Sequence, residues 1–248
     1  MKKTGYKKHI IILMSVVLAA ALIVNLSLAL LVAKRNRDNV FSLGNVRLTL
    51  TEDDFPDDRQ DRTMPPKSIV PKNPKIINVG LSDAYVFLRV TVPLYEVQLI
   101  DETTNKPVGE RTLREVYDLL SDDASAGTVH LNPGYTIGET GRFDYHSKWV
   151  FLRSEVNAEK HTHSYLFGYG AKLDGKSNAE TATLFDRLQL RNILEGELPK
   201  NVAEYVSVSA FGIQADNILN DVHVNDTSSL SEAELKAILS IYEKQEEA

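Results

Sequence analysis

Apolar and polar residues alternate along most of the chain after residue 40, and this pattern predicts a body built of β-strands. In residues 46–50, three aliphatic side chains interleave with Arg47 and Thr49, as in a half-buried strand. The alternation is longer in residues 85–92. One face there carries Val86, Leu88, Val90 and Val92, and the other carries Tyr85, Phe87, Arg89 and Thr91. We predict that the aliphatic face of this strand lies in the core.

Shorter alternating runs follow, and Gly, Asn, Asp and Pro residues separate them. They predict strands over residues 95–100, 149–153, 165–169, 184–190 and 205–213. Many short strands with few helices are typical of a β-sandwich or a β-barrel. The sequence therefore predicts an all-β fold.

Two segments have helical spacing instead. Residues 112–120 predict one short helix inserted between strands. Near the C-terminus, Ser231 and Glu234 have the spacing of a capping box, and apolar residues recur after them at helical intervals: Leu235, Ile238, Leu239 and Tyr242. We predict an amphipathic helix over residues 231–246, with its apolar stripe packed on the sandwich.

The N-terminal residues have the composition of a membrane-crossing segment. A basic stretch, residues 1–9, precedes the apolar run 10–33. A helix that rises about 1.5 Å per residue crosses the hydrocarbon core, about 30 Å thick, within such a run. The lysines before the run place residues 1–9 in the cytoplasm by the positive-inside rule. We expect residues 10–33 to be a transmembrane helix or signal peptide, 34–228 an exported β-sandwich domain, and 229–248 the C-terminal helix and tail.

Two features bear on whether the N-terminal helix is removed. Ser27 and Ala29 have the spacing of a small-x-small cleavage site, which favours a signal peptide and release of the body. Leu31 continues the apolar run beyond that site, and Lys34 and Arg35 follow it, which favours a permanent anchor. Both outcomes remain open at this point.

Composition narrows the classes of partner and chemistry. The chain of 248 residues has no cysteine, so disulfides, thiolate nucleophiles and cysteine-ligated metals are excluded. Its net charge is −6, although four lysines lie in the first nine residues, so the body after residue 33 is still more acidic. An acidic body repels phosphate backbones, and we therefore expect no nucleic-acid partner.

Catalytic and metal-binding patterns are scarce. The sequence contains no H-E-x-x-H, P-loop, G-x-S-x-G or G-x-G-x-x-G motif. His161 and His163 are the closest histidine pair, and on a strand they share a face that could bind a metal with a third ligand. We interpret them instead as part of an exposed turn. The acidic loop 52–66 lacks the order of an EF-hand loop, and we interpret it as a solvated charge run that blocks strand pairing. We therefore assign no catalytic, cofactor-binding or metal-binding residue.

Four stretches, in this order, resemble a known family. They are FSLGNVRLTLTEDDF, IVPKNPKIINVGLSDAYVFLRVTVP, ATLFDRLQL and VSVSAFGIQADNI. Together they are similar to the TasA/camelysin-like exported proteins of Gram-positive bacteria, which carry the alternate, SipW-type signal peptide. The resemblance implies a jelly-roll-like β-sandwich, export, and a role in the biofilm matrix or at the cell surface. Within the second stretch, we interpret Asn78, Ser82 and Asp83 as turn formers.

These observations support one leading hypothesis and two alternatives. The leading hypothesis is a non-enzymatic surface or matrix protein that self-associates, or binds a related matrix protein, by donating residues 39–50 as a strand. The first alternative is a single-pass, membrane-anchored binding module that uses exposed aromatic residues such as Tyr135, Tyr145 and Trp149. The second is a camelysin-like, metal-dependent surface peptidase that uses His161 and His163 with a carboxylate.

Overall fold

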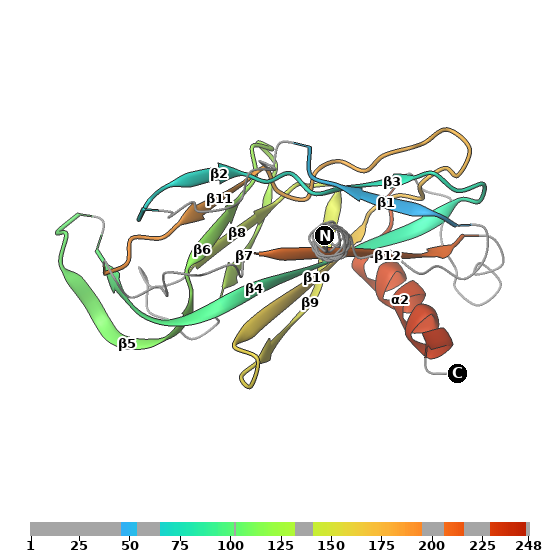
Figure 1. Ribbon diagram of the computed structural model, residues 1–248. Coiled ribbons are helices and arrows are strands. Elements are labelled where there is room, and N and C mark those ends of the chain that lie inside the picture. The colour runs from blue at the N-terminus through green and yellow to red at the C-terminus, as the bar shows by residue number, and fades with distance from the viewer. Residues whose placement is uncertain are drawn as a thin grey trace, which may run out of the picture. The chain divides into compact units, whose positions relative to one another are not determined.

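The computed structural model describes residues 46–53, 65–101, 103–131, 141–194, 206–215 and 229–246 (Figure 1). The predicted membrane segment 10–33 lies outside these ranges. Within them, no helix has both the length and the apolar character needed to cross a bilayer. The strands are β1 Leu48–Thr51, β2 Ile69–Pro71, β3 Lys75–Asn78, β4 Ala84–Ile100, β5 Pro107–Glu115, β6 Tyr117–Leu120, β7 Gly127–Leu131, β8 Gly141–Tyr145, β9 Trp149–Asn157, β10 Thr162–Tyr169, β11 Arg187–Leu190 and β12 Ser207–Gln214, and the helix is α2 Glu232–Glu246.

The first sheet is organised around the long strand β4. Its strand order is β12-β4-β10-β9, and β5 pairs with the C-terminal part of β4. β4 continues through Pro93, so the strand predicted over 95–100 is its second half and not a separate element. Pro93 faces Thr162 at the last pair of the β4–β10 register, where the missing N–H does not interrupt the ladder.

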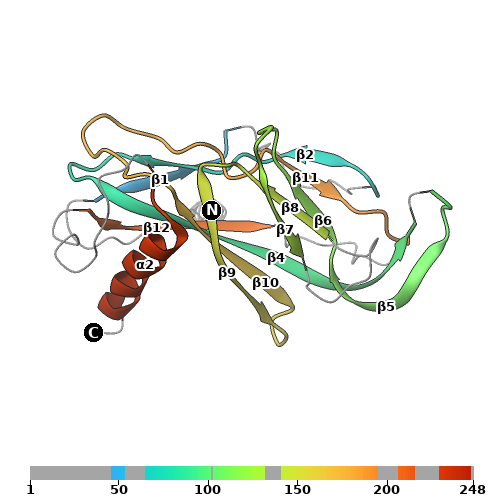
Figure 2. The same cartoon turned by 180° about the vertical axis from the view of Figure 1, so that it is seen from behind.

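The second sheet has the order β2-β11-β6-β8-β7. Its pairs are antiparallel except β6 with β8, which meet in a parallel arrangement at Leu119 and Phe143. β1 and β3 form an additional two-stranded antiparallel pair. Figures 1 and 2 show β1 and β3 beside the end of the first sheet that α2 covers.

The main core lies between the two sheets. The aliphatic face of β4, from Val86 to Val92, is fully buried there, as the alternation predicted. Phe143 of β8 contacts Tyr165 and Phe167 of β10, with ring centroids 5.2 and 5.0 Å apart. Side chains from both sheets thus fill one contiguous interior, and the described body is an all-β sandwich, as predicted.

The C-terminal helix covers the outer face of the first sheet, as predicted. Its buried stripe packs on apolar residues of β4, β9, β10 and β12, and the stripe consists of Leu235, Ile238, Leu239 and Tyr242. The capping box is formed, because the Ser231 hydroxyl accepts from the Glu234 N–H at 3.3 Å and Glu234 accepts from the Ser231 N–H at 2.8 Å. Consequently Tyr85 and Phe87, on the opposite face of β4 from the main core, are also buried.

The prediction of a short helix over residues 112–120 is wrong. This segment is the end of β5 and the whole of β6, with the buried residue Val116 between them. β5 pairs with β4 in the first sheet, whereas β6 pairs with β11 and β8 in the second. The chain changes sheets at Val116, and this break in the alternation produces spacings that resemble a helix.

Several strand boundaries also differ from the predictions. β9 and β10 continue beyond the predicted 149–153 and 165–169 and form a hairpin whose turn includes His161. β11 is shorter than the predicted 184–190, since Leu184 and Phe185 are core residues of the preceding loop. β12 begins at Ser207, and Tyr205 lies outside the described residues.

Candidate functional site: the docked first strand

β1 is the first described strand of the body, and it pairs with one strand, β3. The register runs from Leu48 opposite Asn78 to Thr51 opposite Lys75. One further hydrogen bond, from the Val79 N–H to the Arg47 carbonyl at 2.8 Å, extends the ladder toward the N-terminus. The predicted half-buried strand over residues 46–50 is confirmed as β1, Leu48–Thr51, and within the described ranges its backbone pairs with one strand.

The sandwich contains a slot for the apolar side chains of this strand. Val46 and Leu48 are 6% and 9% exposed and belong to the main core. Gly212 of β12 lies against Leu48, because a Cβ atom built on Gly212 would lie 2.8 Å from Leu48 Cδ1 and 2.8 Å from the Tyr85 carbonyl oxygen. Those distances are below van der Waals contact, so the bare backbone at Gly212 makes room for the Leu48 side chain.

Two ion pairs hold the end of β1. Glu52 lies 2.6 Å from the ammonium group of Lys72, whose side chain is 3% exposed. Asp53 lies 3.1 Å from Lys75, which also contacts Glu180 at 3.1 Å. Hydrogen bonds to Glu180 and then to Asp53 raise the pKa of Lys75. We call these two pairs the β1 clamp. They join the first two acids of the predicted solvated loop to the lysines of the Pro-Lys-x-Pro-Lys stretch.

The lysine side of the clamp is fixed by the body of the chain. The Lys72 N–H donates to the Asp186 carbonyl at 3.0 Å, and the Leu184 N–H donates to the Pro74 carbonyl at 2.9 Å. Pro71 and Pro74 restrict φ on either side of Lys72. Sequence reasoning missed the clamp, although an acid pair directly after one strand and two proline-spaced lysines before another could have suggested it.

The turn after β3 is built as predicted. The Asn78 side chain accepts from the Gly80 N–H at 3.0 Å and donates to the Ser82 carbonyl at 2.9 Å. Asp83 pairs with Lys172 at 2.7 Å and accepts from the Gly175 N–H. These contacts, that of Lys172 first, lower the pKa of Asp83. The polar residues of this turn therefore orient β3, the partner of β1.

The two histidines considered as metal ligands lie in different environments. His161 is exposed in the β9–β10 turn with φ at 50°, whereas His163 is buried. Nδ1 of His163 lies 2.6 Å from Glu115 and 2.8 Å from the Tyr165 hydroxyl, which itself donates to Glu115 at 2.5 Å. Burial, followed by the nearby Glu115 charge, raises the pKa of Tyr165. The prediction that both histidines form an exposed turn is correct for His161 and wrong for His163.

No group of three or more His, Asp or Glu side chains is arranged to hold a metal ion within the ranges that the structure describes. Asp53 is the aspartate of the acidic loop 52–66 that lies in these ranges, and it is paired with Lys75. The Glu115–His163–Tyr165 cluster links the end of β5 to β10 through its hydrogen bonds. We interpret it as a structural contact inside the first sheet.

Two of the aromatic residues considered for ligand binding are not on the surface. Trp149 is buried, donates from its indole N–H to the Ala182 carbonyl at 3.0 Å, and packs against Tyr169. Tyr145 is half-buried against Phe167, with ring centroids 5.1 Å apart. Tyr135 lies outside the described residues. The binding-module alternative therefore loses Trp149 and Tyr145 as exposed contact residues.

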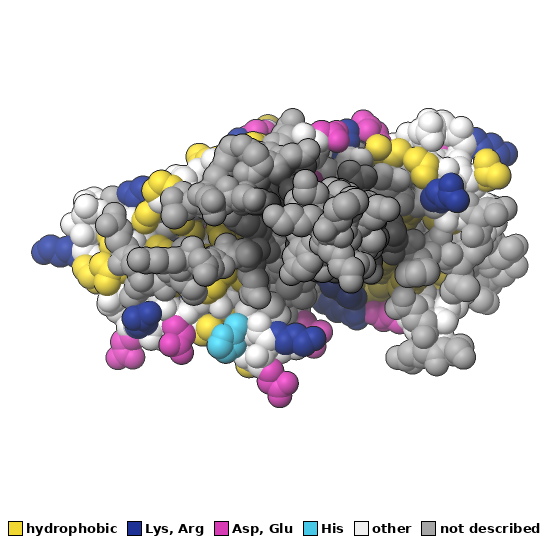
Figure 3. Space-filling model, viewed as in Figure 1, with side chains coloured by type: hydrophobic (Ala, Val, Ile, Leu, Met, Phe, Trp, Pro, Cys, Tyr) yellow, Lys and Arg dark blue, Asp and Glu magenta, His cyan; other side chains and the backbone are white. Residues whose placement is uncertain are grey.

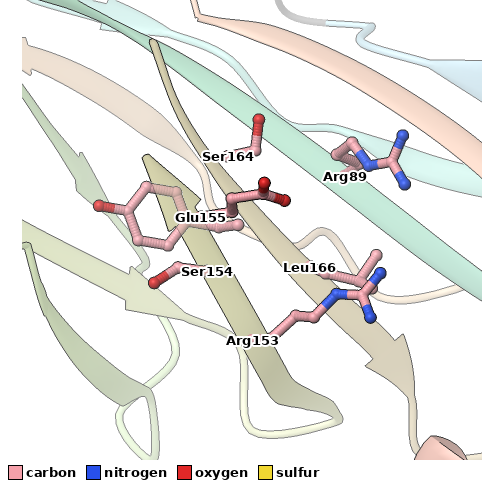
Figure 4. Close-up of a pocket in the computed structure, with 7 residues that line it drawn as sticks. Arg89, Arg153, Ser154, Glu155, Ser164 and Leu166 are labelled. Atoms are coloured by element: carbon pink, nitrogen blue, oxygen red, sulfur yellow. The ribbon is translucent and has the colours of Figure 1, made fainter. Parts of the chain in front are cut away.

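A shallow pocket of about 230 Å³ lies on the outer face of the first sheet. It is lined by Arg89 of β4, by Arg153, Ser154 and Glu155 of β9, and by Ser164, Tyr165 and Leu166 of β10 (Figure 4). Arg153 is already paired with Glu243 at 2.5 Å, and Arg89 lies over the Phe211 ring at 5.7 Å.

On the face seen in Figure 3, acidic and basic side chains of the described residues are interspersed, without a single-sign field for a charged ligand.

Comparison with known proteins adds no relative: no protein-family model, curated protein or solved structure matches the chain. The functional argument therefore depends on the geometry of the described residues. Among the features above, the docked first strand is the one whose construction suits an intermolecular contact.

Proposed function

We propose that the chain is a non-enzymatic, exported surface or matrix protein whose jelly-roll-like sandwich assembles by exchanging its first strand. In this proposal, residues 39–50 of one subunit are the donor segment, and its described residues, 46–50, leave their own β3 and pair with the β3 of the next. The observation that carries the proposal is the slot at Gly212, which receives Leu48 from a strand that pairs, among the described residues, with β3. The sequence resemblance to exported matrix proteins supports the same role.

Strand exchange loses few contacts, because the same residues meet within one subunit and between subunits. The four register pairs of β1 and β3, the buried Leu48 and the clamp would all form again between subunits. Residues 54–66 connect the clamp to Lys67, which donates its N–H to the Leu190 carbonyl of the body at 2.8 Å. A chain of that length spans at most about 43 Å, at about 3.3 Å per residue, which allows β1 to dock on a neighbouring body.

The fate of the N-terminal helix decides the outcome. Cleavage within residues 10–33, after Ala29, releases residues 39–50 for donation, whereas an intact helix holds them beside the membrane. The mass of the N-terminal peptide of protein isolated from producing cells distinguishes the two. If the product assembles, its N-terminal peptide is expected to start after Ala29. An intact N-terminal leader would show that the chain is not released, which contradicts assembly of a released form.

Deletion of residues 39–50 tests donation directly. The deleted chain lacks the donor and is expected to remain unassembled, and fibres that still form would refute the proposal. A synthetic peptide of residues 39–50 supplies the missing strand and is expected to bind the deleted chain and raise its unfolding midpoint. A peptide with Leu48→Asp is the matched control and is expected not to bind, because a carboxylate cannot enter the apolar slot.

A further inference from the structure

The β1 clamp has the features of a recognition site for the incoming strand. Lys72 is almost fully buried, and the pair it forms with Glu52 spans two segments that strand exchange would place on different subunits. We propose that Lys72 and Lys75 select a donor strand that is followed at once by two acids, so that the accepted partner is a second copy of this chain. This inference rests on the proposed strand exchange and names the partner.

The two lysines contribute unequally to this selection. Lys72 meets Glu52 in a buried setting, where the interaction is weakly screened by salt. Lys75 is shared between Asp53 of the donor segment and Glu180 of the acceptor body. The side chain of Asp53 is 59% exposed, so its ion pair contributes less. Glu52 with Lys72 therefore determines selection, and Lys75 supports it.

The acceptor side has contacts that do not involve β1. The backbone hydrogen bonds of Lys72 and Pro74 go to residues 184–186, which belong to the acceptor body. Glu180 continues to hold Lys75 in place. An incoming strand thus meets Lys75 already held by Glu180 and a Lys72 backbone fixed by the body, and preorganisation of this kind lowers the cost of binding.

The spacing of the donor segment matches this acceptor. Val46 and Leu48 enter the slot on one face of the strand, and Glu52 reaches Lys72 four residues after Leu48. A strand of similar hydrophobicity without that acid would fill the slot but lose the buried ion pair. Such a strand is disfavoured because it leaves Lys72 without its carboxylate partner, whereas the natural strand gains the attractive contact with Lys72.

Charge reversal tests the inference in full-length chains that are exported and allowed to assemble. A Glu52→Lys chain or a Lys72→Glu chain alone places like charges at the clamp and is expected to assemble at least about 100-fold less well than the natural chain. A mixture of the two restores opposite charges at every junction between unlike chains, and we expect it to form alternating assemblies. A mixture that assembles no better than its components overturns the inference.

A second measurement guards against variants that fail to fold. Glu52→Gln chains mixed with natural chains are expected to enter assemblies about tenfold less often, since the amide keeps the shape and loses the charge. Asp53→Asn is the matched control and is expected to enter almost equally. Equal incorporation of Glu52→Gln would contradict a selecting role for the buried pair.

Failure of the inference can be told apart from failure of strand exchange. A Thr49→Cys/Ile77→Cys chain leaves the clamp intact and reports, through a disulfide between opposed residues, which chain's β3 each β1 occupies. Disulfides that form between chains irrespective of their clamp charges would support strand exchange and overturn the inference that the clamp selects the donor. Disulfides confined within single chains would overturn both.

Discussion

The contact between Gly212 and Leu48 gives a prediction whose size can be worked out from the structure. In Gly212→Ala, the new methyl group would lie 2.8 Å from Leu48 Cδ1 and 2.8 Å from the Tyr85 carbonyl oxygen. Carbon atoms in ordinary contact are about 3.5–4.0 Å apart, so Leu48 or the strand must shift by roughly 1 Å. Overpacking of this kind costs about 1–3 kcal/mol, and removing a strand glycine offsets about 0.5–1 kcal/mol of that.

A double-mutant cycle separates the two clashes. Leu48→Ala alone is expected to destabilise the body by about 2–3 kcal/mol, the lower part of the range for a buried leucine because the site is at the edge of the core. In that background, Gly212→Ala no longer meets Leu48 Cδ1, and its close contacts are with the Tyr85 carbonyl oxygen and with Val86 Cγ1 at 3.3 Å. We therefore expect its cost to fall by about 1 kcal/mol.

The assay is urea unfolding, followed through the fluorescence of Trp149, which is the single tryptophan of the chain and is buried. A Gly212→Ala variant as stable as the natural chain would show that Leu48 does not occupy this slot. Strict additivity in the cycle would lead to the same conclusion. A destabilisation that Leu48→Ala partly relieves would support the docking of β1 as described.

Three further predictions concern the body that presents the slot. The pKa of Asp83 is lowered, so the stabilising effect of its carboxylate is present at neutral pH and is lost as the pH falls below about 4. Asp83→Asn is therefore expected to reduce the urea midpoint at pH 7 and to make the midpoint fall less steeply in acid. An unchanged acid slope would count against this role of Asp83. Glu115→Ala removes the buried partner of His163 and Tyr165 and is expected to lower the free energy of unfolding by about 3–5 kcal/mol. Glu115→Gln is expected to lower it by about 1–3 kcal/mol. Equal losses of stability would show that the charge of Glu115 is unimportant. Leu235→Ala empties the contact between α2 and the first sheet and is expected to cost about 2–5 kcal/mol, while the exposed neighbour Lys236→Ala is expected to change stability by less than about 0.5 kcal/mol; similar effects would mean that α2 is not packed on the sheet.

Local patterns predicted the elements whose environment is set by their own sequence. The aliphatic face of β4 and the apolar stripe of α2 were found because each buries one side at a regular period. The capping box was found because its residues are three positions apart. Such features need no knowledge of distant segments.

Features that depend on distant segments were missed or misjudged. Tyr85 and Phe87 were placed on the face opposite the core, and only the docking of α2 from the far end of the chain shows why they are buried. The prediction of a helix over residues 112–120 is wrong because the chain changes sheets at Val116. That change depends on pairing with the distant strands β4 and β11, which the local sequence does not show. His163 was expected on the surface, and its burial depends on Glu115 from another strand.

The clamp was missed for a similar reason. Glu52 and Lys72 are separated by the loop that the sequence marks as solvated charge, and the contact of its first two acids with the lysines depends on how β1 docks. Gly212 likewise has a role only because Leu48 lies over it. The elements of the candidate site were therefore foreseen one by one, and their juxtaposition came from the fold.

The most direct test of the central claim determines which chain supplies the β1 that occupies each β3. Thr49→Cys/Ile77→Cys chains, one batch labelled with ¹⁵N and one unlabelled, are mixed in equal amounts before assembly and then oxidised; the chain has no other cysteine. Mass spectrometry of the disulfide-linked peptides then counts mixed isotope pairs. Strand exchange predicts that about half of the linked pairs are mixed. Assemblies in which every pair carries a single isotope would contradict the account.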